Sequence, residues 1–312
     1  DGDVALGFRR LSIIDLADGS QPLYNEDKSL VLLFNGEIYN YQILREELIK
    51  DGHVFKTKTD SEVLIHGYEK YGEKLLDKLR GMFAFVIWDV NKKKLFIARD
   101  FFGIKPMYYA KMNDTFLFGS EIKSFLEHPG FKKELNEDML EYYLSFQFVP
   151  GSDTMFKNVY ALPPAHYLTY ENGKVEVTRY WEPEFNPDES KSYEQCVEDI
   201  TKMMEESVSF HKIADVEVGS YLSSGVDSSY LATQFKGQKS FTVGFNYNKY
   251  NEIDYARELA EEIGQDHYFK KITDDEFWNI VPTVQYYMDQ PHADPSCVAL
   301  YYVCNIASEH VK

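Results

Sequence analysis

The spacing of hydrophobic residues divides the chain near residue 181. Before this point, short apolar runs bounded by turn residues predict β-strands, and the last run contains Asn172-Gly173, a dipeptide typical of hairpin turns. Helical spacing interrupts the strands at 40–50, 61–80 and 136–145. Clustered strands with few helices indicate an α+β layered domain. The strand-like runs are SLVLLF, MFAFVIWDV, KKLFIARD, PMYYAKM, TFLFGS and AHYLTYENGKVEVTRYW.

A polar segment at 182–192, EPEFNPDESKS, separates the two patterns. It contains two prolines and shows no apolar period, so we interpret it as a linker. The sequence therefore predicts one domain over 1–185 and a second over 193–312.

After the linker, helical and strand-like segments alternate. This order is typical of a parallel sheet with helices on both faces, and such sheets bind ligands at the carboxyl ends of their strands. The predicted elements are an amphipathic helix over 193–212, a strand over 216–222, a helix from 227, a strand over 239–245, a helix over 255–264 and a strand over 267–272.

Composition narrows the classes of protein that fit. The 312 residues are 44 % hydrophobic and 16 % aromatic, enough for two globular cores. A net charge of −18 disfavours nucleic acid and anionic membranes as partners. No apolar run is long enough to span a bilayer, and the start lacks a signal-peptide pattern. The three cysteines form no C-x-x-C pair, so we expect small buried hydrophobes in a reducing compartment, without disulfides or a cysteine zinc site.

The loop between the predicted strand at 216–222 and the next helix has the sequence SSGVDSS. Backbone N–H groups at a helix N-terminus favour a bound anion, Gly225 permits close approach, and Asp227 suits phosphate if a magnesium ion bridges them. An ordinary helix N-cap is the alternative, and spacing alone leaves both open. The hydroxyl donors are Ser223, Ser224, Ser228 and Ser229.

This loop lacks the Walker lysine and resembles the S-G-G-x-D-S signature of the PP-loop ATP pyrophosphatases, which cleave ATP between its α and β phosphates. Ser224 stands where that family usually has glycine, and a positive φ there would cost about 1 kcal/mol. The resemblance implies magnesium held near Asp227 through the phosphates. It implies ATP contacts from Leu222, Ser223, Gly225, Asp227, Ser228, Val243 and Gly244.

A second candidate site lies in FNGEIYNY, at 34–41. Read alone, this segment predicts a strand that ends in an Asn35-Gly36 turn. The Asn side-chain amide and the Gly N–H could instead donate two hydrogen bonds to a developing oxyanion.

Several motifs in order, followed by the serine loop, resemble the glutamine amidotransferase domain of asparagine synthetases. They are RRLSIIDL, NGEIYNY, TDSEV, GMFAFVIWD and RDFFGIKPMYY. The resemblance covers essentially the whole chain and implies a four-layer αββα N-terminal-nucleophile fold, followed by the α/β PP-loop domain. It implies that Arg10 binds the glutamine α-carboxylate, that Asn35 and Gly36 form an oxyanion hole, and that Glu37 and Asp60 hold the amino group. Without the resemblance, a surface ion pair would explain Arg10, and helix N-capping would explain Asp60.

The chain departs from the family pattern at both ends. The family nucleophile is an N-terminal cysteine, whereas this sequence begins with Asp1 and has no cysteine before Cys196, so we expect no glutamine hydrolysis by this chain as it stands. Gln290 replaces the Glu of a D-E-P motif, and the sequence stops at Lys312, before a family loop that contributes to the aspartate pocket. We therefore expect a fragment of a longer enzyme.

The resemblance implies an ATP-dependent asparagine synthetase that takes ammonia from glutamine and forms β-aspartyl-AMP from aspartate. Its expected ligands are glutamine, aspartate, ATP and Mg²⁺; it is expected in the cytoplasm, and a homodimer is compatible with the resemblance. One alternative is a relative without the nucleophile that adenylates another carboxylate, as β-lactam synthetases do. Another is a non-catalytic sensor that retains both pockets. A sensor has no evident need for both an oxyanion hole and a pyrophosphate loop, and this disfavours the sensor.

Overall fold

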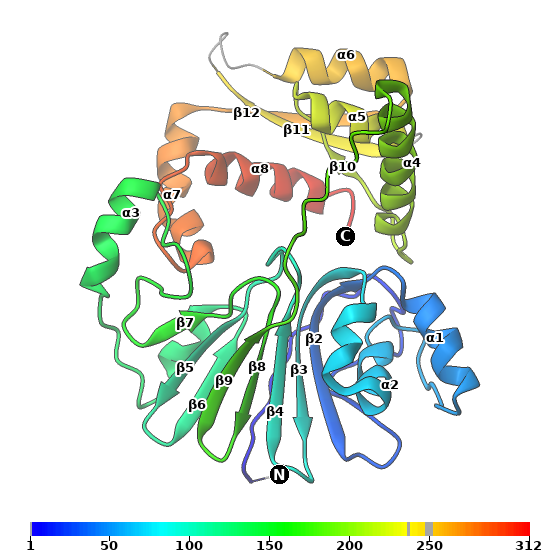
Figure 1. Cartoon of the computed structure of the whole chain (residues 1–312). Coiled ribbons are helices and arrows are strands. Elements are labelled where there is room, and N and C mark those ends of the chain that lie inside the picture. The colour runs from blue at the N-terminus through cyan, green and yellow to red at the C-terminus, as the bar shows by residue number, and fades with distance from the viewer. Residues whose placement is uncertain (1, 236–237, 247–251) are drawn as a thin grey trace. The chain divides into compact units, whose positions relative to one another are not determined.

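The computed structural model describes residues 2–235, 238–246 and 252–312. The chain divides into two compact units, residues 1–187 and 188–312 (Figure 1). In the described part of the chain, no helix combines the length and the apolar character needed to cross a bilayer.

A six-stranded sheet forms the centre of the first unit, with all its neighbouring strands antiparallel. Its apolar runs alternate between two buried faces, which explains their strong hydrophobicity. In sheet order, the strands are β1 (Leu23–Tyr24), β2 (Leu30–Ile38), β3 (Gly81–Asp89), β4 (Lys94–Arg99), β8 (His166–Glu171) and β9 (Lys174–Arg179).

A smaller sheet packs on one face of the large one. Its strands, in the order β6-β5-β7, are β5 (Tyr108–Met112), β6 (Thr115–Gly119) and β7 (Val159–Ala161). Val31, Trp88 and Ile97 of the large sheet share a core with Tyr109 and Phe116 of the small one. This face-to-face core positions the strands that carry the candidate glutamine site.

Helices cover the outer faces of the two sheets. On the large sheet lie α1 (Tyr41–Lys50) and α2 (Glu62–Tyr71), with Tyr68 of α2 4.9 Å from Phe96 between ring centres (Figure 1). On the small sheet the 3-10 helix η2 (Ile122–Glu127) buries Ile122 and Phe125. The predicted αββα layering is confirmed, with a fourth layer reduced to this short helix.

The remaining helices of this unit show where local prediction needed correction. The predicted helix at 61–80 is interrupted because Gly72 adopts a φ of +59°, which ends α2 and begins the 3-10 helix η1 (Gly72–Lys78). The predicted helix at 136–145 begins as the 3-10 helix η3 (Glu137–Met139) and continues as α3 (Leu140–Phe146).

The second unit contains a parallel sheet, as predicted, and the structure places its strands in the order β10-β11-β12. Leu222 and Ala232 belong to a core that includes α6 on one face, and Phe241 packs with Val303 of α8 on the other. Helices therefore cover both faces. The elements are α4 (Tyr193–His211), β10 (Ser220–Tyr221), α5 (Val226–Gln234), β11 (Lys239–Phe245), α6 (Ile253–Ile263), β12 (Asp266–Ile272), α7 (Asp274–Met288) and α8 (Ser296–Ser308).

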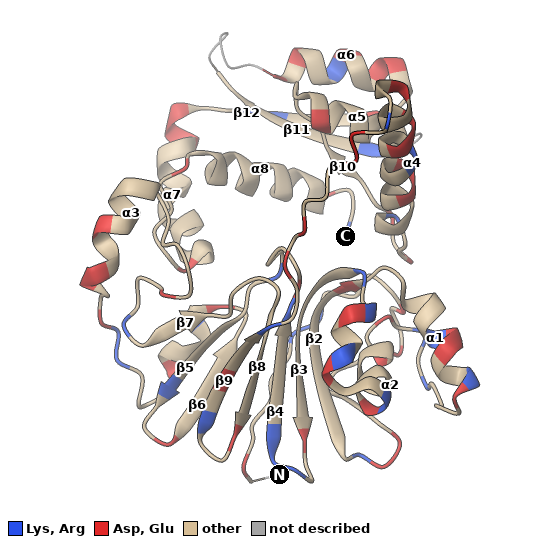
Figure 2. Cartoon of the chain, in the orientation of Figure 1, with Lys and Arg blue, Asp and Glu red and all other residues tan. Residues whose placement is uncertain are grey.

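Two expectations for this unit, buried cysteines and an amphipathic first helix with a buried apolar face, differ from the exposure of these residues in the structure. The cysteines are not buried hydrophobes, because Cys196 and Cys297 are only half-buried and Cys304 is exposed. Helix α4 forms as predicted and begins with a capping box at Ser192, but Val208 is its only fully buried residue among those described. Figure 2 shows acidic residues of this unit on α4, α5, α6 and the start of α7, while α8 carries no charged residue.

Candidate functional site

Arg10 is held by the loop that follows it. Its Nη2 donates hydrogen bonds to the backbone carbonyl oxygens of Ile14 (2.6 Å) and Asp15 (2.8 Å). Gly19 lies against the guanidinium: a Cβ there would stand 2.2 Å from Nη2 and 2.5 Å from Cγ2 of Thr59. Glycine at position 19 therefore lets Arg10 pack beside the segment that carries Asp60.

Asp60 is buried directly before α2 and does not cap it, because the N-cap residue is Ser61. Its Oδ2 accepts a 2.9 Å hydrogen bond from the backbone N–H of Ile38, which follows Glu37 on β2. The pKa of Asp60 is raised to about 7, first by burial and also by the negative charge of Glu37, while backbone hydrogen bonds act in the opposite direction. A cation beside these two carboxylates would favour their ionised forms and so lower the pKa of Asp60.

The Asn35-Gly36 dipeptide lies within β2 and is not a turn, which corrects the local prediction. Gly36 pairs with Phe83 of β3, and a Cβ at position 36 would stand 2.1 Å from the backbone oxygen of Met82. Close approach of two strands therefore requires this glycine. Nδ2 of Asn35 points to the Ser120 hydroxyl at 3.5 Å.

These contacts bring together the residues predicted to bind glutamine. Asn35, Gly36 and Glu37 are consecutive on β2, Asp60 bonds the next residue of that strand, and Arg10 adjoins Thr59 through Gly19. A positive guanidinium and two carboxylates near one strand suit a zwitterionic amino acid.

The motif RDFFGIKP anchors a loop beside this strand, a role that sequence reasoning missed. The Asp100 carboxylate is buried and accepts hydrogen bonds from four backbone N–H groups, those of Phe83, Phe102, Ile104 and Lys105. The Arg99 guanidinium donates to the carbonyl oxygens of Lys105, Leu162 and Gly103 at 2.6–2.7 Å. The charged Arg-Asp pair inside an apolar stretch was the signal that could have indicated this anchor.

Glu62 fastens the segment before Asp60 to α2. Its carboxylate accepts hydrogen bonds from the backbone N–H groups of Lys56 and Thr57, both at 2.7 Å, and from the Thr57 hydroxyl. Burial alone would raise the pKa of Glu62, but hydrogen bonds from His66 and these groups lower it to about 2. Glu62 therefore stays ionised at neutral pH.

The raised pKa of Asp60 predicts a pH-dependent stability. The ordinary pKa is 3.8, so the folded state holds this proton more tightly than the unfolded chain. The contribution of Asp60 to the free energy of unfolding should be most favourable below about pH 4, fall by up to about 1.4 kcal/mol per pH unit, and level off above about pH 7. Urea denaturation from pH 4 to 8, compared with Asp60→Asn, measures this change. A difference between the two proteins that is independent of pH would contradict it.

The serine loop lies between β10 and α5, at the carboxyl end of a parallel strand. The Ser223 and Ser228 hydroxyls are 2.8 Å apart, and the Ser228 hydroxyl oxygen accepts a hydrogen bond from the Ser223 N–H. The Gly225 N–H donates to the Ser223 hydroxyl at 3.1 Å, and Gly225 is the N-cap residue of α5. The loop thus gathers hydroxyls at a helix N-terminus, where an anion is favoured.

Three features of this loop bear on nucleotide binding. Ser224 does not have a positive φ, so serine in place of glycine carries no left-handed strain. A Cβ at Gly225 would lie 3.2 Å from the Ser223 hydroxyl, so little room remains for a side chain. Asp227 is exposed in the first turn of α5, where an oxygen ligand can reach a cation from solvent.

The other residues predicted to contact the nucleotide lie directly after β10 or on β11. Leu222 is buried, and its carbonyl oxygen accepts a hydrogen bond from the Thr242 hydroxyl. The Val243 side chain packs toward the α8 core, and Gly244 is buried one residue further along β11. Leu222 thus lies at the end of β10, and Val243 and Gly244 near the end of β11.

Comparison with known proteins agrees with this two-part arrangement. A family model described as a glutamine amidotransferase domain matches residues 1–181, and one described as asparagine synthase matches residues 199–312. Asparagine synthetase [glutamine-hydrolyzing] 1 of Bacillus subtilis is 41 % identical over the whole chain, which covers 50 % of that protein. A putative asparagine synthetase [glutamine-hydrolyzing] of Mycobacterium tuberculosis is 39 % identical, again over 100 % of the chain and 50 % of the relative.

The chain thus spans about half the length of these curated relatives. Among solved structures, the glutamine phosphoribosylpyrophosphate amidotransferase of B. subtilis is 18 % identical with a TM-score of 0.38, covering 80 % of this chain and 48 % of that one; this likeness is too weak to support an inference. The two family matches and the identity over the full chain establish the family without this structural likeness. The chain belongs to the asparagine synthetase family, with a glutamine amidotransferase domain followed by an asparagine synthase domain.

Proposed function

We propose that the protein to which this chain belongs is a ligase that converts aspartate to asparagine, using ATP and ammonia released from glutamine. The family membership and the relatives named as glutamine-hydrolysing asparagine synthetases support this proposal. We further propose that this enzyme is cytoplasmic and assembles as a homodimer.

In the first domain, the proposed role of the described residues is to bind and polarise glutamine. Arg10 would pair with the α-carboxylate, and Glu37 and Asp60 with the ammonium group. Asn35 and Gly36 would donate hydrogen bonds to the oxyanion that develops when the amide is attacked. The observation that carries this proposal is the buried Asp60 carboxyl, hydrogen-bonded to β2 directly after Asn35, Gly36 and Glu37.

In the second domain, the serine loop would hold the pyrophosphate part of ATP. Ser223 and Ser228 would contribute hydroxyls, Gly225 close backbone approach, and Leu222, Val243 and Gly244 contacts to the nucleotide. Magnesium near Asp227 would neutralise charge on the leaving pyrophosphate. The hydroxyl cluster at the α5 N-terminus and the exposed carboxylate support these roles.

The proposed chemistry is adenylation followed by amide formation. The aspartate β-carboxylate attacks the α-phosphorus of ATP, giving β-aspartyl-AMP and pyrophosphate. Ammonia then attacks the acyl carbon and AMP leaves. The parts of the relatives that this chain does not span would contribute the remaining groups.

A nitrogen-donor experiment tests this division of labour. The full-length protein, supplied with ATP, Mg²⁺ and aspartate, should form asparagine with glutamine and with ammonium. Asp60→Ala should lower the glutamine-dependent rate by at least about 100-fold, because a buried charge partner is lost, and leave the ammonium-dependent rate within about twofold.

The exposed Asp114→Ala is the matched control and should change neither rate. Equal loss of both rates in Asp60→Ala would contradict the assignment of Asp60 to glutamine binding. Absence of asparagine with either donor would favour a relative that adenylates a different carboxylate, the second candidate.

A further inference from the structure

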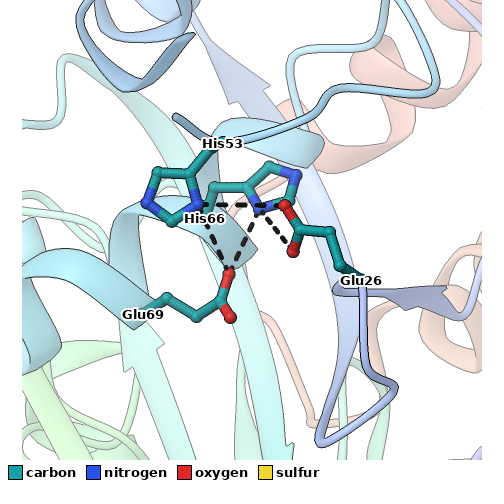
Figure 3. A group of neighbouring side chains, drawn as sticks. All are labelled: Glu26, His53, His66 and Glu69. Carbon is teal, nitrogen blue, oxygen red and sulfur yellow. Dashed lines mark hydrogen bonds and ion pairs between the residues drawn. The ribbon is translucent and has the colours of Figure 1, made fainter. Parts of the chain in front are cut away.

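Four side chains outside both proposed sites converge on one point of the first domain. Figure 3 shows two imidazole rings and two carboxylates turned toward one another. Each offers one ligand atom, and these atoms all lie within 4.8 Å of one another. We name them the His–Glu cluster; its members are Glu26, His53, His66 and Glu69.

The distances within the His–Glu cluster fit a small coordination sphere. Nδ1 of His66 lies 3.2 Å from Glu69 and 3.6 Å from Glu26, and Nδ1 of His53 lies 3.7 Å from Glu69 and 4.0 Å from Glu26. Ligands about 2.0–2.1 Å from a tetrahedral metal ion are about 3.3–3.4 Å apart. The widest separation in the cluster, up to 4.8 Å, would have to shorten by up to about 1.4 Å, which side-chain rotations of the partly exposed members can supply.

The surrounding structure holds these ligands in place. The backbone N–H of Val54 donates to Oε1 of Glu26, and the Asn25 side chain donates to Oε1 of Glu69. The backbone N–H of His53 donates to the carbonyl oxygen of Leu48. Partners behind the ligands orient them, as in known metal sites.

His66 is the buried member, with a side chain only 1 % exposed. Its Nδ1 faces the cluster, while Nε2 lies 3.6 Å from the ionised carboxylate of Glu62, so a proton on Nε2 would leave Nδ1 free to coordinate.

The chemistry of the ligands indicates the kind of ion. Two neutral imidazoles and two carboxylates carry a net charge of −2, which a divalent cation balances. Imidazole nitrogen suits zinc and its neighbours better than magnesium or calcium, which prefer oxygen alone. The side chains of Glu26, His53 and Glu69 are 19–37 % exposed, so an ion can enter from solvent.

We propose that the His–Glu cluster binds one divalent transition-metal ion, with Zn²⁺ as the best fit. The ion would join the turn before β2 to the loop at 51–61 and to helix α2, which follows that loop directly. Because the loop carries Asp60, the ion would also brace the segment with the proposed glutamine-binding carboxylate. Sequence reasoning missed the cluster; the His-x-x-Glu spacing of His66 and Glu69 was its only local signal.

The test begins with the full-length protein stripped of metal by a chelator and dialysed. Isothermal titration with Zn²⁺ should give one site per chain outside the ATP-binding loop. At a hundredfold excess over the dissociation constant, Zn²⁺ should raise the unfolding temperature by about 5 °C. Co²⁺ in its place should give visible absorption bands of the intensity expected for four-coordination.

Variants decide whether the cluster is the site. His53→Ala and Glu69→Gln change partly exposed residues, so both variants should fold. Each should weaken Zn²⁺ binding at least about 10-fold, because losing a group that only orients a metal ligand already weakens binding about 10- to 100-fold. The exposed His211→Ala and the serine-loop variant Asp227→Ala should bind Zn²⁺ like the wild type. No Zn²⁺ binding by the wild type, or equal binding by the two cluster variants, would overturn the proposal and leave the cluster as an ion-pair network around His66.

Discussion

Asp227→Ala is expected to lower the rate of aspartate-dependent pyrophosphate release by the full-length protein by at least about 100-fold. If Asp227 holds magnesium against the phosphates, its loss removes several kcal/mol of charge stabilisation from the transition state. The fold should persist, because Asp227 is exposed in the first turn of α5 and contributes only about 0.3–1 kcal/mol there through the helix dipole.

The measurement is continuous detection of pyrophosphate with saturating ATP and aspartate, together with thermal unfolding of each variant. Glu194→Ala is the matched control, since it removes an acidic residue from the first turn of another exposed helix, α4. It should match the wild type in rate. Pyrophosphate release that is unchanged in Asp227→Ala would remove the proposed magnesium role and leave Asp227 as an ordinary first-turn residue.

Asp100→Ala is expected to lower the free energy of unfolding by at least about 3–5 kcal/mol. The variant leaves four backbone N–H groups around a buried position without their carboxylate acceptor, and charge-assisted hydrogen bonds of this kind are the strong ones. Loss on this scale approaches the whole stability of a typical domain. We therefore expect poor recovery of soluble protein as well.

Urea denaturation monitored by tryptophan fluorescence measures this loss. Asp77→Ala, which removes an exposed aspartate from the same domain, should change the free energy of unfolding by no more than about 0.5 kcal/mol. Asp100→Asn keeps one acceptor oxygen but turns an N–H donor toward N–H donors, so it should also destabilise strongly. A loss below about 1 kcal/mol in Asp100→Ala would mean that water replaces the carboxylate around the loop.

The two proposed sites differ in how far the local sequence could indicate them. The serine loop is continuous in sequence, and its position after a strand and before a helix follows from the change in apolar spacing. The glutamine-site residues were found by resemblance alone, since Arg10 or Asp60 taken singly has an ordinary structural explanation. Their assigned roles stay predictions until the variants are measured.

The types of most elements, the order of strands and helices along the second domain and the family could all be predicted without a structure. Apolar residues recur every two positions in strands and every three to four in helices, and this spacing can be read from the sequence without knowledge of the fold. Gly72 and Ser224 show the limit of this reasoning: whether φ is positive at a given residue depends on its neighbours in space as well as on its type.

Contacts between residues that are distant in sequence became visible only in the three-dimensional structure. Asn35-Gly36 lies in a strand because β2 pairs with β3 along this stretch, and Met82 of β3 leaves no room for a side chain at position 36. Asp100 accepts hydrogen bonds from Phe83 of β3 and from the loop at 102–105, and the His–Glu cluster joins a turn, a loop and a helix. Whether a side chain is buried, or lies close enough to others to bind an ion, depends on distances in space. These distances are set by how the helices and strands pack against one another.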